Sequence, residues 1–180
     1  MSASCTLFLA TISLLSSISL VAQKEQRQPL TETQVDQIRE AGDSPDDRIH
    51  LYTKFLDEHV DKIRGLTSRG HSSARSHRLD NELQDLTALM DELGSNLDQY
   101  GERKADIRKS VKALNEDLPH WRDVLNSLPT DPVFDLARTE AIDSVKDLSD
   151  QVTPLLKEQT DYFLLHKDEA GQQRAEPKPQ

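Results

Sequence analysis

A heptad pattern of apolar side chains in the middle of the sequence limits the possible folds more than any other feature. Apolar residues alternate spacings of four and three from Leu79 to Leu128, and only Lys104 departs from the pattern. A repeat of about 3.5 residues over about seven heptads is typical of helices that pack around partner helices. The pattern predicts one helix over residues 78–127, about 75 Å long at about 1.5 Å per residue. The positions of this heptad stripe are Leu79, Leu83, Leu86, Met90, Leu93, Leu97, Tyr100, Lys104, Ile107, Val111, Leu114, Leu118, Trp121, Leu125 and Leu128.

Three residues inside this run disfavour a straight helix. Gly94, Gly101 and Pro119 cost about 1 kcal/mol (Gly) to about 3 kcal/mol (Pro) in an exposed helix interior, although none of them shifts the register. We expect kinks at these positions. The alternative is a turn between Gly94 and Gly101, which would give four shorter helices and a compact bundle.

Helices are also predicted on both sides of the run. Thr31 and Gln34 form a capping box for a short helix that stops at Gly42, and Ser44 caps a second helix beginning at Pro45. The last helix is expected to restart after Pro129, with Asp131 as its cap and Pro132 in its first position. The second helix carries Ile49, Tyr52, Leu56, His59, Ile63 and Leu66 on one side, and the last carries Phe134, Ala141, Val145, Leu148, Val152, Leu155, Gln159, Tyr162 and His166. The predicted fold is all-α: an elongated antiparallel helical bundle or coiled coil of three long helices plus a short N-terminal helix.

The N-terminus has the character of an export signal. Residues 1–22 contain no charged side chain, and the apolar run at 7–15 has the length of a signal-peptide core rather than of a membrane span. The alternative is an uncleaved anchor. The predicted division of the chain is a signal peptide at 1–22, a polar spacer at 23–29, a helical domain at 30–167 and a disordered tail at 168–180. The mature protein is therefore expected in the periplasm or outside the cell, with no transmembrane span and without Cys5.

The charge of the chain is acidic, with one local reversal. A net charge of −10 argues against a nucleic-acid-binding protein, which would carry a basic face. Between Asp61 and Asp80, however, there are cationic residues and no acidic ones, and they are Lys62, Arg64, Arg69, Arg75 and Arg78. This stretch is a candidate docking loop for an anionic component of the cell envelope, such as a phosphate-bearing lipid or an acidic protein. Alternatively, it is a solvated loop whose charges neutralise helix ends.

The sequence contains no arrangement that points to catalysis or to a metal. No two histidines have the spacing that places them on one helical face, and Asp117 with His120 has no second such pair to complete a dimetal site. No glycine-rich phosphate loop or nucleophile elbow occurs. We therefore expect no enzyme activity and no cofactor. If the chain binds a metal or a small ligand, His59, His120 and His166 are the first candidates.

One short motif suggests a family. Leu30-Thr31-Glu32-Thr33-Gln34 resembles the LTxxQ motif of the periplasmic envelope-stress chaperones, which are small exported helical proteins that hold unfolded clients. The wider pattern is similar to exported bacterial helical proteins of unassigned function. These resemblances imply an envelope setting. The prediction is a non-enzymatic helical interaction protein of the cell envelope, a scaffold, adaptor or holdase, with a protein partner or self-association. The alternative is a small-ligand or metal-binding helical bundle.

Overall fold

The computed structural model describes residues 28–68, 70 and 72–171, all of it helices and the turns between them. There are five α-helices: α1 (Glu32–Glu40), α2 (Pro45–Thr67), α3 (Ser73–Glu102), α4 (Arg108–Asn126) and α5 (Asp135–Leu165). No strand occurs in the described ranges. The predicted signal peptide, nearly all of the spacer and residues 172–180 lie outside them. None of the described helices has both the length and the apolar character needed to cross a membrane.

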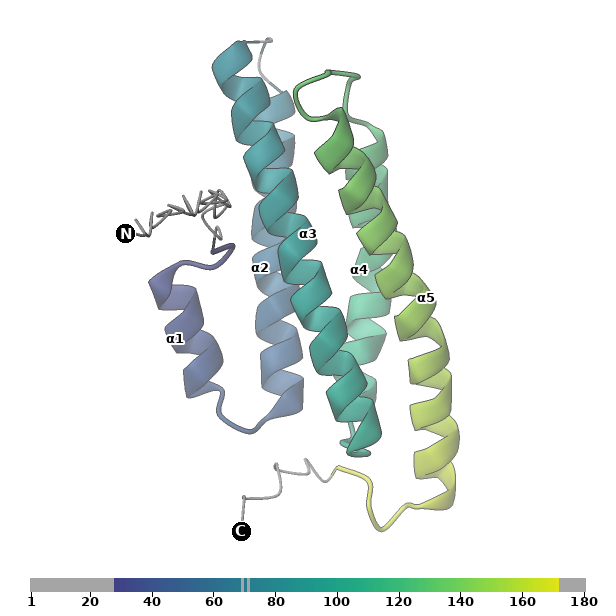
Figure 1. The fold of residues 1–180 in the computed structure, drawn as a ribbon. Coiled ribbons are helices and arrows are strands. Elements are labelled where there is room, and N and C mark those ends of the chain that lie inside the picture. The colour runs from purple at the N-terminus through teal and green to yellow at the C-terminus, as the bar shows by residue number, and fades with distance from the viewer. Residues whose placement is uncertain (1–27, 69, 71, 172–180) are drawn as a thin grey trace, which may run out of the picture.

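Helices α2 to α5 form a four-helix bundle (Figure 1). α2 packs against α3 and α4, and α5 packs against the same two helices, whereas the short α1 contacts only α2. α3 and α4 follow each other in the chain but lie on a diagonal of the bundle, because they do not contact each other. The end of α2, the start of α3 and the α4–α5 connection lie together at one end, called here the loop end. The α1–α2 and α3–α4 turns and the C-terminus of α5 lie at the opposite end, called the turn end.

The predicted single helix over 78–127 is wrong, because the chain turns back at residues 103–107. The turn is a Schellman motif: the Ala105 amide donates to the Tyr100 carbonyl at 3.1 Å, and the Lys104 amide donates to the Gly101 carbonyl at 3.0 Å. Lys104 takes the left-handed conformation that glycine usually takes at this position, with φ of 55°. The alternative of four shorter helices is therefore close to the structure, with the turn just beyond Gly101.

Lys104 is thus a turn residue and not a charged member of a helical stripe. Its ammonium group lies 2.9 Å from Glu158 Oε1 and 5.5 Å from the centre of the Tyr162 ring, both on α5. The apolar residues on both sides of it are nevertheless buried, so the heptad stripe identifies the core correctly across the break.

The two glycines of α3 mark a close helix contact. A Cβ added at Gly94 would lie 3.1 Å from Gln151 Oε1, and one added at Gly101 would lie 3.2 Å from Leu155 Cδ1, both on α5. Gln151 Nε2 donates to the Gly94 carbonyl at 2.9 Å and so joins the two helices. Helix α3 continues through Gly94. This glycine allows close packing against α5 and does not break the helix.

The predicted helix starts are confirmed for α1 and α2 and shifted for α5. The Thr31–Gln34 capping box is present, Ser44 caps α2 with Pro45 in the first turn, and Gly42 has a φ of 57° at the end of α1. Asp131 caps only a single turn: its carboxylate accepts from the Val133 amide at 3.0 Å, and α5 itself begins at Asp135.

The described start of the predicted tail is hydrogen-bonded to the bundle. The Gly171 amide donates to Asp106 Oδ2 at 2.7 Å, and the Tyr162 hydroxyl donates to Glu169 Oε2 at 2.9 Å. These contacts place Glu169 and Gly171, at the start of the predicted tail, against the end of the bundle.

The turn conformation predicts the effect of one substitution. Lys104→Gly removes the strain of a left-handed non-glycine residue and should raise the free energy of unfolding by about 1 kcal/mol. Loss of the ion pair with Glu158 offsets only part of this gain in stability, since exposed ion pairs contribute roughly 0–1 kcal/mol. Urea unfolding measures the difference. The control is Lys104→Ala, which loses the ion pair but keeps the strain and should not stabilise the protein; equal effects of both variants would contradict the assignment.

Candidate functional site

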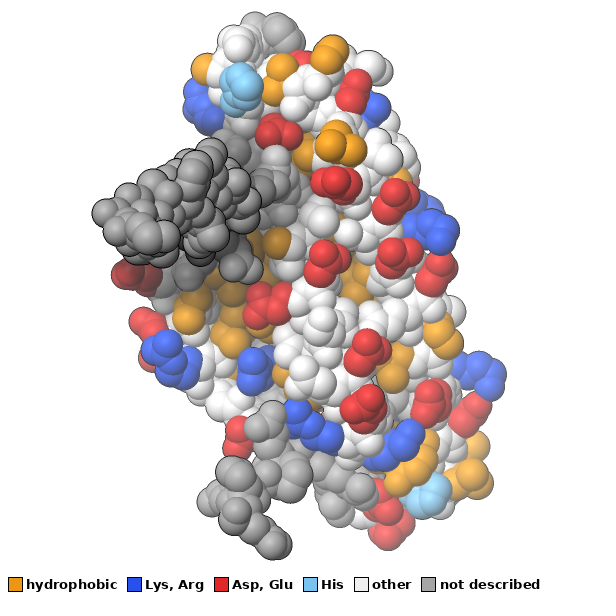
Figure 2. All heavy atoms as spheres, in the orientation of Figure 1, with side chains coloured by type: hydrophobic (Ala, Val, Ile, Leu, Met, Phe, Trp, Pro, Cys, Tyr) orange, Lys and Arg blue, Asp and Glu red, His pale blue; other side chains and the backbone are white. Residues whose placement is uncertain are grey.

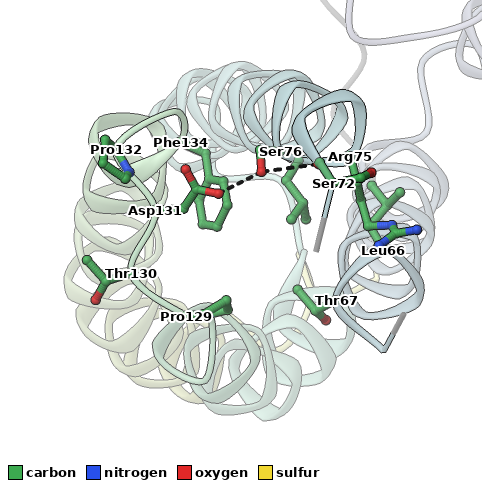
Figure 3. Close-up of a pocket in the computed structure, with 11 residues that line it drawn as sticks. Leu66, Thr67, Ser72, Arg75, Ser76, Pro129, Thr130, Asp131, Pro132 and Phe134 are labelled. Carbon is green, nitrogen blue, oxygen red and sulfur yellow. Dashed lines mark hydrogen bonds between the residues drawn. The ribbon is translucent and has the colours of Figure 1, made fainter. Parts of the chain in front are cut away.

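A partly apolar cavity lies at the loop end of the bundle (Figure 3). It has a volume of about 320 Å³. Apolar side chains from three helices and a loop form its walls, among them Leu66 of α2, Leu79 of α3 and Phe134 at the start of α5. Polar groups line the rest, and these are Thr67, Ser72, Arg75, Ser76, Thr130 and Asp131, with Pro129 and Pro132 at the α4–α5 connection.

A buried hydrogen bond ties the two sides of the cavity together. The Ser76 hydroxyl donates to Asp131 Oδ2 at 2.6 Å, and both residues are buried. Figure 3 shows the two side chains next to each other at the end of the bundle, with the Phe134 ring close to the carboxylate. A buried carboxylate needs a hydrogen-bond donor of this kind, because leaving a charged group unpaired away from water costs roughly several kcal/mol. The pair therefore fixes the α4–α5 connection against the first turn of α3.

The described residues of the predicted docking loop lie on two helices, α2 and α3. Lys62 and Arg64 lie on α2, whereas Arg75 and Arg78 lie in the first turns of α3, which begins at Ser73. Arg69 lies outside the described residues. Among the four that the structure describes, Arg75 alone lines the cavity. Arg78 is exposed, and its Nε donates to the Ala74 carbonyl at 3.3 Å within the same helix.

Lys62 and Arg64 have partners on neighbouring helices. Arg64 Nη2 lies 2.7 Å from His120 Nε2 on α4. Because a guanidinium group only donates, this ring nitrogen accepts, which places the proton of a neutral His120 on Nδ1. Lys62 Nζ lies 3.8 Å from Glu82 Oε2 on α3. These contacts support the reading of Lys62 and Arg64 as charges that join helices.

The three histidines named as metal or ligand candidates do not come together. His59 is buried on α2, and its Nδ1 lies 2.8 Å from Glu82 Oε2. His120 is exposed on α4, and His166 follows α5 at the turn end, stacked 4.2 Å from the Tyr162 ring. No group of three or more His, Cys, Asp or Glu residues that could hold a metal ion occurs in residues 28–68, 70 and 72–171.

One carboxyl group at the α2–α4 contact, that of Asp117, has a raised pKa. Trp121 is fully buried and its Nε1 donates to Asp57 Oδ1 at 2.7 Å. Burial and then the nearby charge of Asp57 raise the pKa of the Asp117 carboxyl above its ordinary value of 3.8, while His120 acts in the opposite direction. The folded protein therefore holds the Asp117 proton more tightly than the unfolded chain does.

The raised pKa predicts a pH-dependent effect of removing this charge. As pH rises from 3.8 through the raised pKa, the unfolded chain loses the proton first, so Asp117 lowers the stability of the fold. Asp117→Asn should raise the free energy of unfolding at about pH 7, by less than about 1 kcal/mol because solvent screens the charge. Below the ordinary pKa the difference should vanish. Urea titrations of parent and variant at both pH values measure it, with exposed Asp123→Asn as the control; a gain that does not change with pH would contradict the assigned cause.

Sequence reasoning missed the cavity and its Ser76–Asp131 bond. Ser76 was assigned to a loop because it lies in a polar, serine-rich stretch, and Asp131 was assigned only a capping role. The two residues are 55 positions apart in the chain, so no local pattern links them. Ser76 is buried because α3 begins at Ser73, earlier than the predicted start at residue 78. This burial is what the sequence pattern did not indicate.

Comparisons with family models, with curated proteins and with solved structures found no match. The resemblance of residues 30–34 to the LTxxQ motif stays a prediction, and the same residues form the capping box of α1.

Proposed function

We propose that this protein is a non-enzymatic helical interaction protein of the cell envelope that binds a partner protein at the loop end of its bundle. The observation that supports the proposal is the cavity of about 320 Å³ with apolar walls. Protein interfaces often depend on one or two apolar or aromatic side chains that fill such a pocket. The envelope location rests on the predicted signal peptide.

The surface around the cavity adds to this support. Four large apolar residues are exposed within the described ranges, and two of them, Val133 and Leu136, lie within two residues of Phe134, which lines the cavity. Leu136 is 73% exposed. An exposed apolar residue beside a hollow is typical of a binding surface when polar residues surround it. Arg75 and Arg78 lie on the α3 side, which favours a partner segment with acidic residues next to its apolar anchor.

The chemistry of the cavity favours binding over catalysis. Its described lining includes a serine hydroxyl and a carboxylate but no histidine or lysine that could serve as a general base. The Ser76 hydroxyl already donates to Asp131, and both groups are buried, so they act in the fold of the site.

Site-specific photo-crosslinking tests the proposal. A photoreactive amino acid at exposed Thr130, on the rim of the cavity, should capture a discrete partner in the envelope fraction of the native host. The same amino acid at Lys157, an exposed residue of α5 near the other end, should not. Equal capture from both positions, or no discrete product from Thr130, would contradict binding at the loop end.

Charge reversal tests the predicted chemistry of the partner. Arg75→Glu together with Arg78→Glu should weaken capture from Thr130 at least tenfold at low salt, because both cations lie in the first turns of α3, near the proposed acidic segment. Arg122→Glu on α4 is the matched control, since Arg122 is exposed and does not line the cavity. Far-UV circular dichroism confirms that the variants stay folded. Unchanged capture by the double variant would rule out an acidic partner.

A second candidate function is the binding of a small apolar ligand, which the same cavity favours. Its volume of about 320 Å³ falls within the range of roughly 300–1,000 Å³ that is common for small-molecule pockets. Native mass spectrometry of gently purified protein should then show a bound molecule that Leu79→Trp displaces. A protein that carries no such mass, yet crosslinks from Thr130, would favour the partner protein.

A further inference from the structure

A second, smaller pocket lies at the turn end, between the first turns of α2 and the last turns of α3. Its volume is about 160 Å³. Six residues line it: Asp43, Arg48, Asn96, Gln99, Tyr100 and Arg103. All of them except Asp43 carry N–H or O–H donors in their side chains. Figure 2 shows Lys and Arg side chains gathered towards this end, below a face of α3 and α5 that carries many acidic side chains.

Arg48 has no partner in the part of the chain that the structure describes. The residue is half-buried, and its Nε is fully buried without a hydrogen bond. A guanidinium group is always charged and presents five donors, so a buried N–H group without an acceptor is unfavourable. An acceptor that enters the pocket would satisfy it.

Two carboxylates in this region, Glu92 and Asp43, do not meet this need. Glu92 accepts the Tyr52 hydroxyl hydrogen bond at 2.5 Å. Burial and Glu92 raise the pKa of Tyr52 to about 12, so the hydroxyl keeps its proton and goes on donating to Glu92 at neutral pH. Asp43 is exposed in the α1–α2 turn and forms no ion pair with Arg48.

A second guanidinium group completes the pocket from α3. Arg103 Nη2 donates to Gln99 Oε1 at 3.2 Å, and its guanidinium carbon lies 5.9 Å from the centre of the Tyr100 ring. Two guanidinium groups from neighbouring helices therefore face one small space together with an amide and a phenol. Guanidinium groups match the oxygens of phosphate and sulfate through paired, charge-assisted hydrogen bonds.

We propose that this pocket binds a small tetrahedral oxyanion, with phosphate as the chemical class and with Arg48 and Arg103 as the main ligands. The volume of about 160 Å³ is too small for a drug-sized molecule, for which roughly 300 Å³ is the lower limit. It is sufficient for one phosphate group, either free or at the end of a larger molecule. This site lies at the opposite end from the proposed partner-binding cavity and does not depend on it.

Calorimetric titration with inorganic phosphate at constant ionic strength tests the proposal on the full mature protein. The parent should bind one phosphate per chain, and Arg48→Gln and Arg103→Gln should each bind at least tenfold more weakly. Arg122→Gln, an exposed residue of α4 outside the pocket, should bind as the parent does. Phosphate should also raise the Tm of the parent but not that of Arg48→Gln, because a ligand stabilises the state that binds it.

Substitution of Asp43 is expected to change the affinity for phosphate in the opposite direction. Its carboxylate is the only acidic group among the described residues that line the pocket, so Asp43→Asn should tighten phosphate binding several-fold. General loss of structure cannot produce opposite effects from Asp43→Asn and Arg103→Gln. No saturable binding by the parent, or equal binding by the parent and Arg103→Gln, would overturn the proposal.

A further comparison distinguishes the source of the phosphate group. Vesicles that contain phosphatidic acid should bind the parent more tightly than Arg48→Gln if a lipid head group occupies the pocket. Binding of inorganic phosphate with no such vesicle binding would identify a free anion.

Discussion

The left-handed turn at residues 103–107 determines the architecture of this protein. A heptad stripe that continued as one helix would leave a rod about 75 Å long, with only parts of it covered by the helices before and after. The Schellman motif at Tyr100–Ala105 reverses the chain instead, so that α3 and α4 pack into one bundle with α2 and α5. Both candidate sites follow from this reversal. It brings the end of α2, the start of α3 and the α4–α5 connection together at one end, and it places Arg103 beside the start of α2 at the other.

The sequence predicted the buried faces well and the path of the chain less well. The capping box at Thr31 and the start at Pro45 were correct because a local hydrogen bond determines each of them. The turn was missed because a heptad pattern specifies which side chains are buried and not whether the helix continues between them. Lys104 did not indicate a turn, because glycine is the usual residue in the left-handed conformation that ends α3. Gly94 and Gly101 suggested kinks, but they allow close contact with α5.

The sites were harder to predict than the fold because each one joins residues that are distant in the chain. The basic stretch at 62–78 was predicted as one loop. Helix geometry divides it: Arg64 faces His120 of α4, Lys62 faces Glu82, and Arg75 lines the cavity. Between the two ends, the face of α3 and α5 is rich in acidic side chains (Figure 2). Like charges on that face disfavour contact with another acidic surface, so on the proposed function the two ends are the places where partners and anions bind.

A distance measurement between α3 and α4 tests the reversal at residues 103–107 most directly. Spin labels at His77, near the start of α3, and at Asn126, at the end of α4, occupy exposed positions. With Cys5 replaced in any form that retains it, pulsed electron resonance should give a single distance below roughly 30 Å, because both sites lie at the loop end of one bundle. A continuous helix would separate them by roughly 75 Å, and a distribution centred near that value would contradict the four-helix bundle.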